Sequence, residues 1–199
     1  MPRWFWILAA IALLGWWFSP PMHFARAHAP GELAAEAPEQ HDLWHAATFR
    51  IKDFTITPLA DFSVTARVLS RADYRFDRAA ALSPTDLALG WERMSDSAVL
   101  AKLDIEQSGR WYTYRWSTEG PPIPKPEIIR SSANMHMIPA DATVRYELKQ
   151  VRPGDVVRID GQLIEARRDD GSVWRSSMTR DDTGDGACEV VYVRSLLVK

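Results

Sequence analysis

The chain contains one cysteine, Cys188, and His136 is the only histidine after residue 47. A thiol acts as a nucleophile once it loses its proton, and a neighbouring histidine is the usual base. These residue types therefore predict one specific chemistry, in which the sulfur of Cys188 attacks a carbonyl carbon and His136 handles the proton. Arg194, or alternatively Arg180, is expected to stabilise the oxyanion that such an attack creates.

A purely structural role accounts for the same two residues. Free cysteines are among the most buried residue types, so Cys188 can open the last strand as a part-buried small side chain behind a glycine-rich turn. His136 can cap a turn before Pro139. In this interpretation Asp185 and Glu189, which flank the cysteine, are solvated. Both interpretations are open from the sequence.

A short aromatic stretch, RWYTYRW, contains the second candidate site. Its alternation predicts a strand at residues 110–116 that carries aromatic side chains on both faces. Trp111, Tyr112, Tyr114 and Trp116 could bind a glycan or a peptide, next to the proline-rich stretch GPPIPKP that follows. The alternative is that they pack into the core against helices expected between residues 83 and 103.

The acidic stretch before the cysteine suggests a metal site at first sight. Asp181, Thr183, Asp185 and Gly186 match the first half of an EF-hand loop in type and spacing. The loop needs a bidentate carboxylate at its twelfth position, where this chain has Tyr192. We therefore expect an acidic turn with no metal site, and we expect no cofactor elsewhere.

The first residues, MPRWFWILAAIALLGWWFSPP, predict a membrane segment. An uncharged apolar run at residues 4–18 follows the positive charge of Arg3. Ala25-Arg26-Ala27 fits a signal-peptidase site, which favours cleavage and secretion. The aromatic residues at both ends of the run favour an uncleaved anchor, which is our preferred interpretation. Either way, the rest of the chain is expected on the periplasmic or extracytoplasmic side of a bacterial inner membrane.

The amino-acid composition limits the kinds of partner that the chain is expected to bind. The net charge of −2 and the pI near 6.2 argue against a nucleic-acid-binding protein, which would carry a strongly basic face. A single cysteine allows no internal disulfide, so the core alone must hold the exported domain together. The expected partners are the membrane, through the N-terminal segment, and an envelope protein, a peptide or a glycan.

The remaining pattern divides the chain into three parts: a signal-anchor or signal peptide at 1–21, a linker at 22–47, and one globular domain at 48–199. In the domain we expect strands at 48–59 and 61–71, helices starting at Ser83 and near Ser95, and a stiff extended connection after residue 116. A helix capped by Asp141, a strand interrupted at Gly161, a hairpin at Asp170-Gly171 and a final strand from Cys188 follow. The fold class is α+β: a β-rich, strongly bent sheet or small barrel with two or three short helices.

Three resemblances accompany these patterns. His136, the stretch VRYELKQVRPGDVVRI, a strand hairpin, Cys188 and Arg194 follow in an order that resembles the C-terminal half of sortase transpeptidases. Sortases carry a His, a Cys and an Arg on a β-barrel behind an N-terminal anchor, so the resemblance implies a cysteine transpeptidase that uses these three residues. The strand GDVVRIDGQL is similar to those of OB-type barrels. Most of the chain after the linker resembles a group of bacterial membrane-anchored envelope proteins of unassigned function.

The sequence thus leads to two hypotheses of different classes. The first is a membrane-anchored envelope protein whose β-rich domain binds a partner or assists assembly without catalysis. The alternative is a cysteine-dependent transpeptidase or peptidase. They differ in one structural requirement, since catalysis needs His136 and Cys188 to meet beside an accessible groove.

Overall fold

The structure, a computed structural model, describes residues 4–9, 11, 25–184 and 186–199. The strands are β1 (Glu39–Asp42), β2 (Phe49–Ile51), β3 (Phe54–Asp73), β4 (Thr85–Gly90), β5 (Leu103–Ser108), β6 (Trp111–Trp116), β7 (Ser132–Pro139), β8 (Val156–Arg168), β9 (Val173–Arg175) and β10 (Glu189–Val198). The helical elements of the domain are the 3-10 helix η1 (Glu92–Ser95), α2 (Ser97–Leu100), α3 (Lys125–Arg130) and α4 (Ala142–Gln150). The chain is therefore strand-rich with short helices, as its alternating patterns predict.

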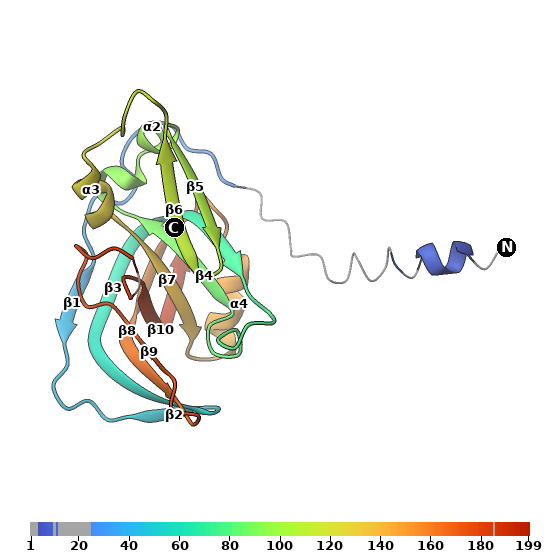
Figure 1. Cartoon of the computed structure of the whole chain (residues 1–199). Helices are drawn as coiled ribbons and strands as arrows, with labels where there is room; N and C mark the ends of the chain where they lie inside the picture. Colours follow the sequence, from blue (N-terminus) through green and yellow to red (C-terminus); the bar gives the residue numbers. More distant parts are fainter. Residues whose placement is uncertain (1–3, 10, 12–24, 185) are drawn as a thin grey trace.

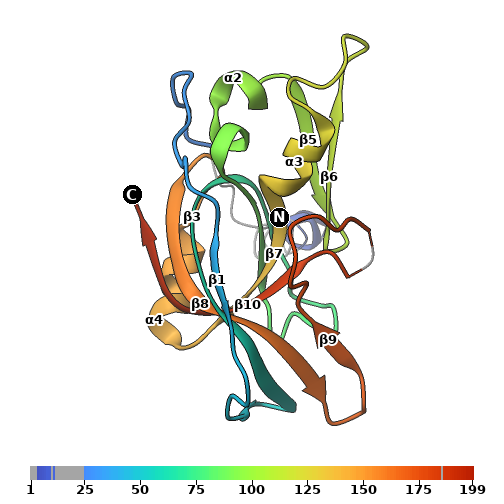
Figure 2. The same ribbon diagram turned by 90° about the vertical axis from the view of Figure 1, so that its left-hand side faces the viewer.

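The large sheet closes into a ring of strands. β3, β4, β7, β10 and β8 pair in this order, and β8 pairs again with β3. All of these pairings are antiparallel except β7 with β10, which run parallel. The long strand β3 closes the ring, because its first part pairs with β8 and its last residues pair with β4 (Figures 1 and 2).

One apolar cluster fills the space between these strands and α4. It includes Val64 of β3, Leu87 of β4, Met135 of β7 and Val191 of β10, all buried. Asp141 caps α4 by accepting a hydrogen bond from the Val144 backbone N–H at 2.9 Å, as its sequence predicts. The helix thereby presents its apolar residues to the ring.

The β5–β6 hairpin forms a separate two-stranded sheet. In Figure 1 it lies in front of β4 and β7, with α2 and α3 near its upper end. Tyr114 and Trp116 of β6 pack against a small cluster that contains Met94, Val99 and Ile128. The hairpin is thus held as a wall beside the ring.

The helix expected from Ser83 is wrong, because residues 85–90 form strand β4. All six residues of this strand are buried, and it pairs with β3 on one side and β7 on the other. A short apolar run that is buried on both faces carries no period that separates strand from helix. The second expected helix does exist as α2, but Asp96 caps it instead of Ser95.

Several other boundaries differ from expectation. Strand β3 continues through Pro58, with a register shift against β8 between Pro58 and Ala60, so the expected pair of strands around this proline is one strand. Residues 125–130 of the expected extended connection form α3. Residues 39–42 of the expected linker form β1 and pair with β3.

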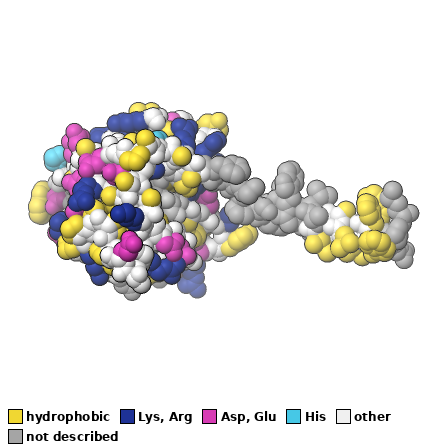
Figure 3. Space-filling model, turned by 90° about the horizontal axis from the view of Figure 1, so that it is seen from above, with side chains coloured by type: hydrophobic (Ala, Val, Ile, Leu, Met, Phe, Trp, Pro, Cys, Tyr) yellow, Lys and Arg dark blue, Asp and Glu magenta, His cyan; other side chains and the backbone are white. Residues whose placement is uncertain are grey.

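The N-terminal segment is described only in part. Residues 4–9 and 11 are helical, and their apolar side chains are visible as the yellow group at one end of Figure 3. Residues 1–3, 10 and 12–21 of the expected membrane segment lie outside the described residues. Within the described part of the chain, no helix combines the length and the apolar character needed to cross a membrane.

Candidate active site

Strand register brings an acid, a histidine and the cysteine to one place. Asp86 of β4 lies directly opposite His136 of β7. On the other side of β7, Glu189 pairs with Met135, so Cys188 enters β10 beside Asn134. The Asn134 Nδ2–H donates to Cys188 Sγ at 3.6 Å. Residues 134 and 136 share one face of β7, and the thiol therefore lies on the same face as the imidazole.

His136 connects the other two groups. Its Nδ1 lies 2.9 Å from Asp86 Oδ2, and the Cys188 side chain lies near enough to raise the pKa of the ring. Only 3% of His136 is exposed, and its ring packs against Trp174 with 4.6 Å between ring centroids. Asp86 is fully buried. Because Asp86 occupies Nδ1, the second ring nitrogen is the one left for the thiol.

The environment favours the protonated form of His136. Burial alone lowers its pKa, but the Asp86 carboxylate and the Cys188 side chain outweigh this effect, so the pKa lies above the ordinary 6.5. A carboxylate behind the imidazole stabilises the imidazolium that forms when the ring takes a proton. The ring is thus prepared to accept a proton from the adjacent thiol.

Arg110 holds the acid in place. It lies in the tight turn between β5 and β6 with φ of 68°, and its Nη1 donates to Asp86 Oδ1 at 3.0 Å. Its Nη2 donates to Asp77 Oδ1 at 2.9 Å, and its guanidinium lies over the ring of Tyr74 at 4.1 Å. The carboxylate of Asp86 is therefore fixed between a guanidinium and an imidazole.

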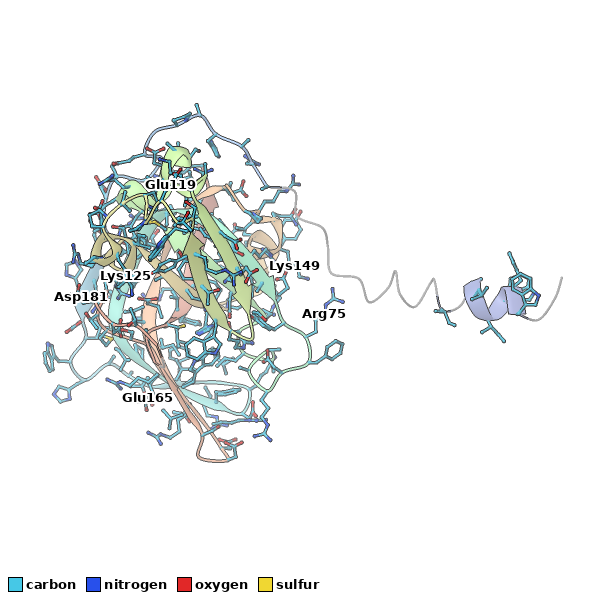
Figure 4. All side chains as sticks on the ribbon, turned by 45° about the horizontal axis from the view of Figure 1, so that its top comes forward. Arg75, Glu119, Lys125, Lys149, Glu165 and Asp181 are labelled. Carbon is cyan, nitrogen blue, oxygen red and sulfur yellow. The ribbon has the colours of Figure 1, made fainter. Side chains whose placement is uncertain are left out.

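Cys188 opens onto a groove of about 430 Å³. One wall is the aromatic strand, because Trp111, Tyr112, Tyr114 and Trp116 all line it. The two candidate sites of the sequence are therefore parts of one site. Lys125 also lines this groove, and in Figure 4 it lies, with Asp181, on the side of the domain away from Arg75.

The aromatic side chains also serve the core. Tyr114 and Trp116 stack with 6.1 Å between their centroids and pack on the cluster below the hairpin, whereas Trp111 is 46% exposed. Burial raises the pKa of Tyr112, whose hydroxyl donates to Ser132 Oγ at 3.3 Å. The sequence offered core packing and ligand binding as alternatives for these residues. Along β6, some of the aromatic side chains pack in the core while Trp111 is exposed at the groove.

A buried ion pair closes the groove on the cysteine side. Arg180 Nη1 contacts Glu189 Oε1, and Arg180 Nη2 donates to Gln40 Oε1 at 2.7 Å. Burial lowers the pKa of Arg180 to about 10. Glu189 is only 1% exposed, so the expectation that it is solvated is wrong. Its carboxylate is buried because it pairs with this arginine.

Arg194, the arginine expected beside the cysteine, is not brought to the site. It lies at a register shift of β10, its side chain is 55% exposed, and its Nη1 lies 3.8 Å from Asp61 Oδ1. Arg180, the second choice from the sequence, is the arginine that shares the groove with Cys188. Cys188 itself is part-buried, as expected.

The acidic loop before the cysteine holds itself together with its own groups. The Ser177 hydroxyl donates to Asp182 Oδ2 at 2.6 Å. Asp181, Thr183 and Gly186 are described, whereas Asp185 lies outside the described residues. Within the described ranges, no group of three or more His, Cys, Asp or Glu side chains is arranged to hold a metal ion.

Sequence reasoning missed Asp86, which it placed at a helix start. The available signal was an acidic residue at the head of the apolar run TDLALG, since a buried carboxylate is rare unless it is paired. Nothing in the local sequence marked Asn134 or Arg110 as site residues, because only the fold brings them to the site.

A comparison of the chain with protein-family models, with curated proteins and with solved structures finds no match.

Proposed function

We propose that the chain is a cysteine-dependent acyl transferase or peptidase, in which Cys188 is the nucleophile and His136 the general acid and base. The observation that carries this proposal is the grouping of Asp86, His136 and Cys188, in which the acid lies 2.9 Å from the imidazole and the thiol lies next to the ring, beside an accessible groove. Enzymes activate a nucleophile by placing a base within hydrogen-bonding reach of it and a third group that orients the base.

The reaction has two steps. His136 takes the thiol proton, and Sγ of Cys188 attacks the carbonyl carbon of the scissile amide. The C–N bond then breaks, His136 gives its proton to the departing amine, and a thioester remains on Cys188. In the second step water or an amine attacks the thioester, His136 takes the proton of this nucleophile, and the C–S bond breaks. Such proton transfer contributes roughly 10²- to 10⁴-fold to the rate.

Two groups fit the oxyanion that forms in each step. The Asn134 amide lies beside the sulfur and is held there, because Gln107 donates to its Oδ1 at 2.7 Å while its Nδ2 donates to the Arg110 carbonyl at 3.0 Å. Arg180 lines the same groove with a partly desolvated guanidinium. Donors that are fixed before the reaction stabilise developing charge without reorganisation.

The envelope assignment belongs to the same proposal. The apolar run near the N-terminus supports a membrane anchor with the domain on the extracytoplasmic side of a bacterial membrane. The order of histidine, hairpin and cysteine supports a sortase-like transpeptidase, and the closed ring of strands supports the small barrel that such enzymes have. We propose this combination as the specific form of the activity.

A non-catalytic binding domain is the second candidate. The observation that favours it is the aromatic wall of the groove, which offers flat apolar surfaces next to Lys125 and Arg180. Such surfaces bind peptides and glycans without any reaction. In this case Cys188 and His136 would only complete the floor of the groove.

The two candidates are separated by acylation with a simple activated ester. The full-length chain is mixed with p-nitrophenyl acetate, and we expect a burst of one p-nitrophenol per chain together with an acetyl group on the Cys188 peptide, detected by mass spectrometry. The burst is expected to disappear in Cys188→Ala and to slow by on the order of 10²-fold in His136→Gln. Trp44→Ala, an exposed residue outside the groove, serves as the control with an unchanged burst. A thiol that acetylates no faster in the parent chain than in His136→Gln would leave the binding domain as the better account.

A further inference from the structure

Cys188 lines two cavities. The second cavity, of about 280 Å³, is lined by Trp111, Trp174, His136, Arg110, Arg175 and Cys188, among others. Trp111, Gly184 and Cys188 line both cavities. Cys188 therefore borders two cavities whose other lining residues differ in their chemistry.

The proton-transfer group faces only one of these sides. His136 lines the second cavity and does not line the aromatic groove, whereas Asn134, Arg180 and Glu189 line the groove alone. A general acid must reach the leaving amine, and the same group must later reach the incoming nucleophile, by microscopic reversibility. Both must therefore lie on the His136 side of the sulfur, which leaves the aromatic groove for the acyl portion.

From this division we infer that the second cavity is the acceptor site, and that it takes a small primary amine next to an apolar or aromatic group. This inference rests on the proposed acyl-transfer function. The ring of Trp174 packs against His136 at a tilt with 4.6 Å between centroids, and Trp111 is 46% exposed, so two tryptophans border the cavity that His136 lines. The cavity volume lies near the lower end of ligand pockets, roughly 300–1,000 Å³, which suits one or two residues of an acceptor.

The acceptor site also explains how transfer competes with hydrolysis. His136 is almost completely buried, so a nucleophile that its free ring nitrogen activates must come through this cavity. An amine that fills the cavity excludes water from the base while the thioester waits on Cys188. The amine nitrogen then attacks the thioester carbon, its proton passes to His136, the C–N bond forms and the C–S bond breaks. The sulfur leaves as the thiolate, which takes the proton back from His136.

The test uses the acetylated full-length chain. After p-nitrophenyl acetate has loaded Cys188, excess reagent is removed, and the loss of the acetyl mass is followed in the presence of L-phenylalaninamide or glycinamide. These two amines react through the same group and differ only in the side chain. We expect deacylation to rise and level off with phenylalaninamide, with a second-order rate about tenfold or more above that of glycinamide. Acetyl-phenylalaninamide is the expected product.

Substitutions at Trp174 test whether this cavity causes the preference for phenylalaninamide over glycinamide. Trp174→Ala is expected to bring the ratio between the two amines close to one, while Trp174→Phe retains most of it. Trp44→Ala, which removes an exposed indole elsewhere, leaves the ratio unchanged. The alkylation rate of Cys188 by iodoacetamide shows whether the His136–Cys188 pair survives in each variant, because that rate reports on the thiol and not on the acceptor.

The outcomes are distinct. An acetyl-enzyme that both amines consume at equal, unsaturable rates, or that only water consumes, overturns the acceptor site and leaves the acyl-transfer chemistry in place. A ratio that is unchanged in Trp174→Ala overturns it as well. A chain on which no acetyl-Cys188 forms overturns the proposed function, and the acceptor site falls with it.

Discussion

Asp86 Oδ2 and His136 Nδ1 lie 2.9 Å apart, and both side chains are withdrawn from solvent. An unpaired carboxylate at this depth would be costly, and here it is balanced by His136 on one side and Arg110 on the other. Asp86 and His136 face each other across β4 and β7, while Cys188 immediately precedes β10. The contact is therefore set by the register of the ring and not by a flexible loop.

Asp86→Asn removes the charge but keeps the shape of the side chain. We expect the acetylation burst of Cys188 to slow by on the order of 10²-fold or more, because the imidazolium loses its stabilising carboxylate. The burst rate with p-nitrophenyl acetate measures this effect. Asp104→Asn is the control, since Asp104 is exposed and pairs only at the surface with Arg115. Equal burst rates in the two variants would contradict a role for the acid.

Arg110→Ala is expected to act through Asp86. The variant removes the guanidinium that pairs with two carboxylates, of which Asp86 is fully buried, and it leaves that carboxylate short of a partner. We expect the free energy of unfolding to fall by about 3 kcal/mol, measured by urea titration. Arg115→Ala, at an exposed ion pair of the same hairpin, should change it by less than about 1 kcal/mol. A loss in Arg110→Ala as small as that control would be evidence against the buried pair.

The raised pKa of His136 makes a part of the stability depend on pH. A histidine with a folded-state pKa above its unfolded value of 6.5 stabilises the fold fully below pH 6.5, and this contribution disappears as the pH rises through the folded pKa. The stability difference between the parent chain and His136→Gln should therefore be largest below pH 6.5 and should become smaller as the pH rises toward 9. Urea titrations across this range measure the difference. The opposite trend, with a larger difference at high pH, would mean that burial dominates and His136 is neutral.

The two candidate arginines are expected to behave differently. Arg180→Ala should slow acetylation of Cys188 by about tenfold or more, because this guanidinium lines the groove on the cysteine side. Arg194→Ala should leave the burst within about twofold of the parent chain, because its side chain points to Asp61 and solvent. Burst measurements with both variants under the same conditions show which arginine assists the acetylation of Cys188. A larger loss in Arg194→Ala would restore the arrangement that the sequence first indicated.

The pairing of β8 with β10 leaves no room for a side chain at Gly161. A Cβ at Gly161 would lie 2.2 Å from the carbonyl oxygen of Tyr192 on the paired strand β10. Moving the paired backbone to make room would be energetically costly. Gly161→Ala should therefore lower the free energy of unfolding by about 2 kcal/mol or more in a urea titration. Ala166→Gly, also on β8 but in a regular stretch, should cost only about 1 kcal/mol. A smaller loss at Gly161 than at Ala166 would indicate that the register differs here.

The sequence predicted the elements that depend on local signals. Asp141 caps its helix, Asp170-Gly171 turns the β8–β9 hairpin, and the alternation of WYTYRW makes a strand. Each of these depends on residues close together in the chain, such as a capping carboxylate, a turn glycine or a two-residue period. Strand β4 could not be predicted in this way, because its burial on both faces comes from partners 12 to 52 residues away.

The same limit explains what was found and what was missed at the site. Cys188 and His136 were identified because each is the only one of its kind in the domain. Asp86 competes with many other carboxylates, and nothing local distinguishes it until β4 pairs with β7. Arg194 was preferred over Arg180 on sequence order, whereas a register shift in β10 and the fold of the preceding loop decide which arginine reaches the groove. The pairing of distant strands decides which residues meet at the site, and this pairing cannot be read from a single sequence.

The most direct test of the central claim is the rate at which iodoacetamide alkylates Cys188 at about pH 6, compared between the parent chain and His136→Gln. Mass spectrometry follows the modification, and circular dichroism checks that both chains are folded. If His136 activates the thiol, the parent chain should react on the order of tenfold faster or more than the variant. Equal rates in two folded chains would contradict the account, because the thiol would then act independently of the histidine beside it.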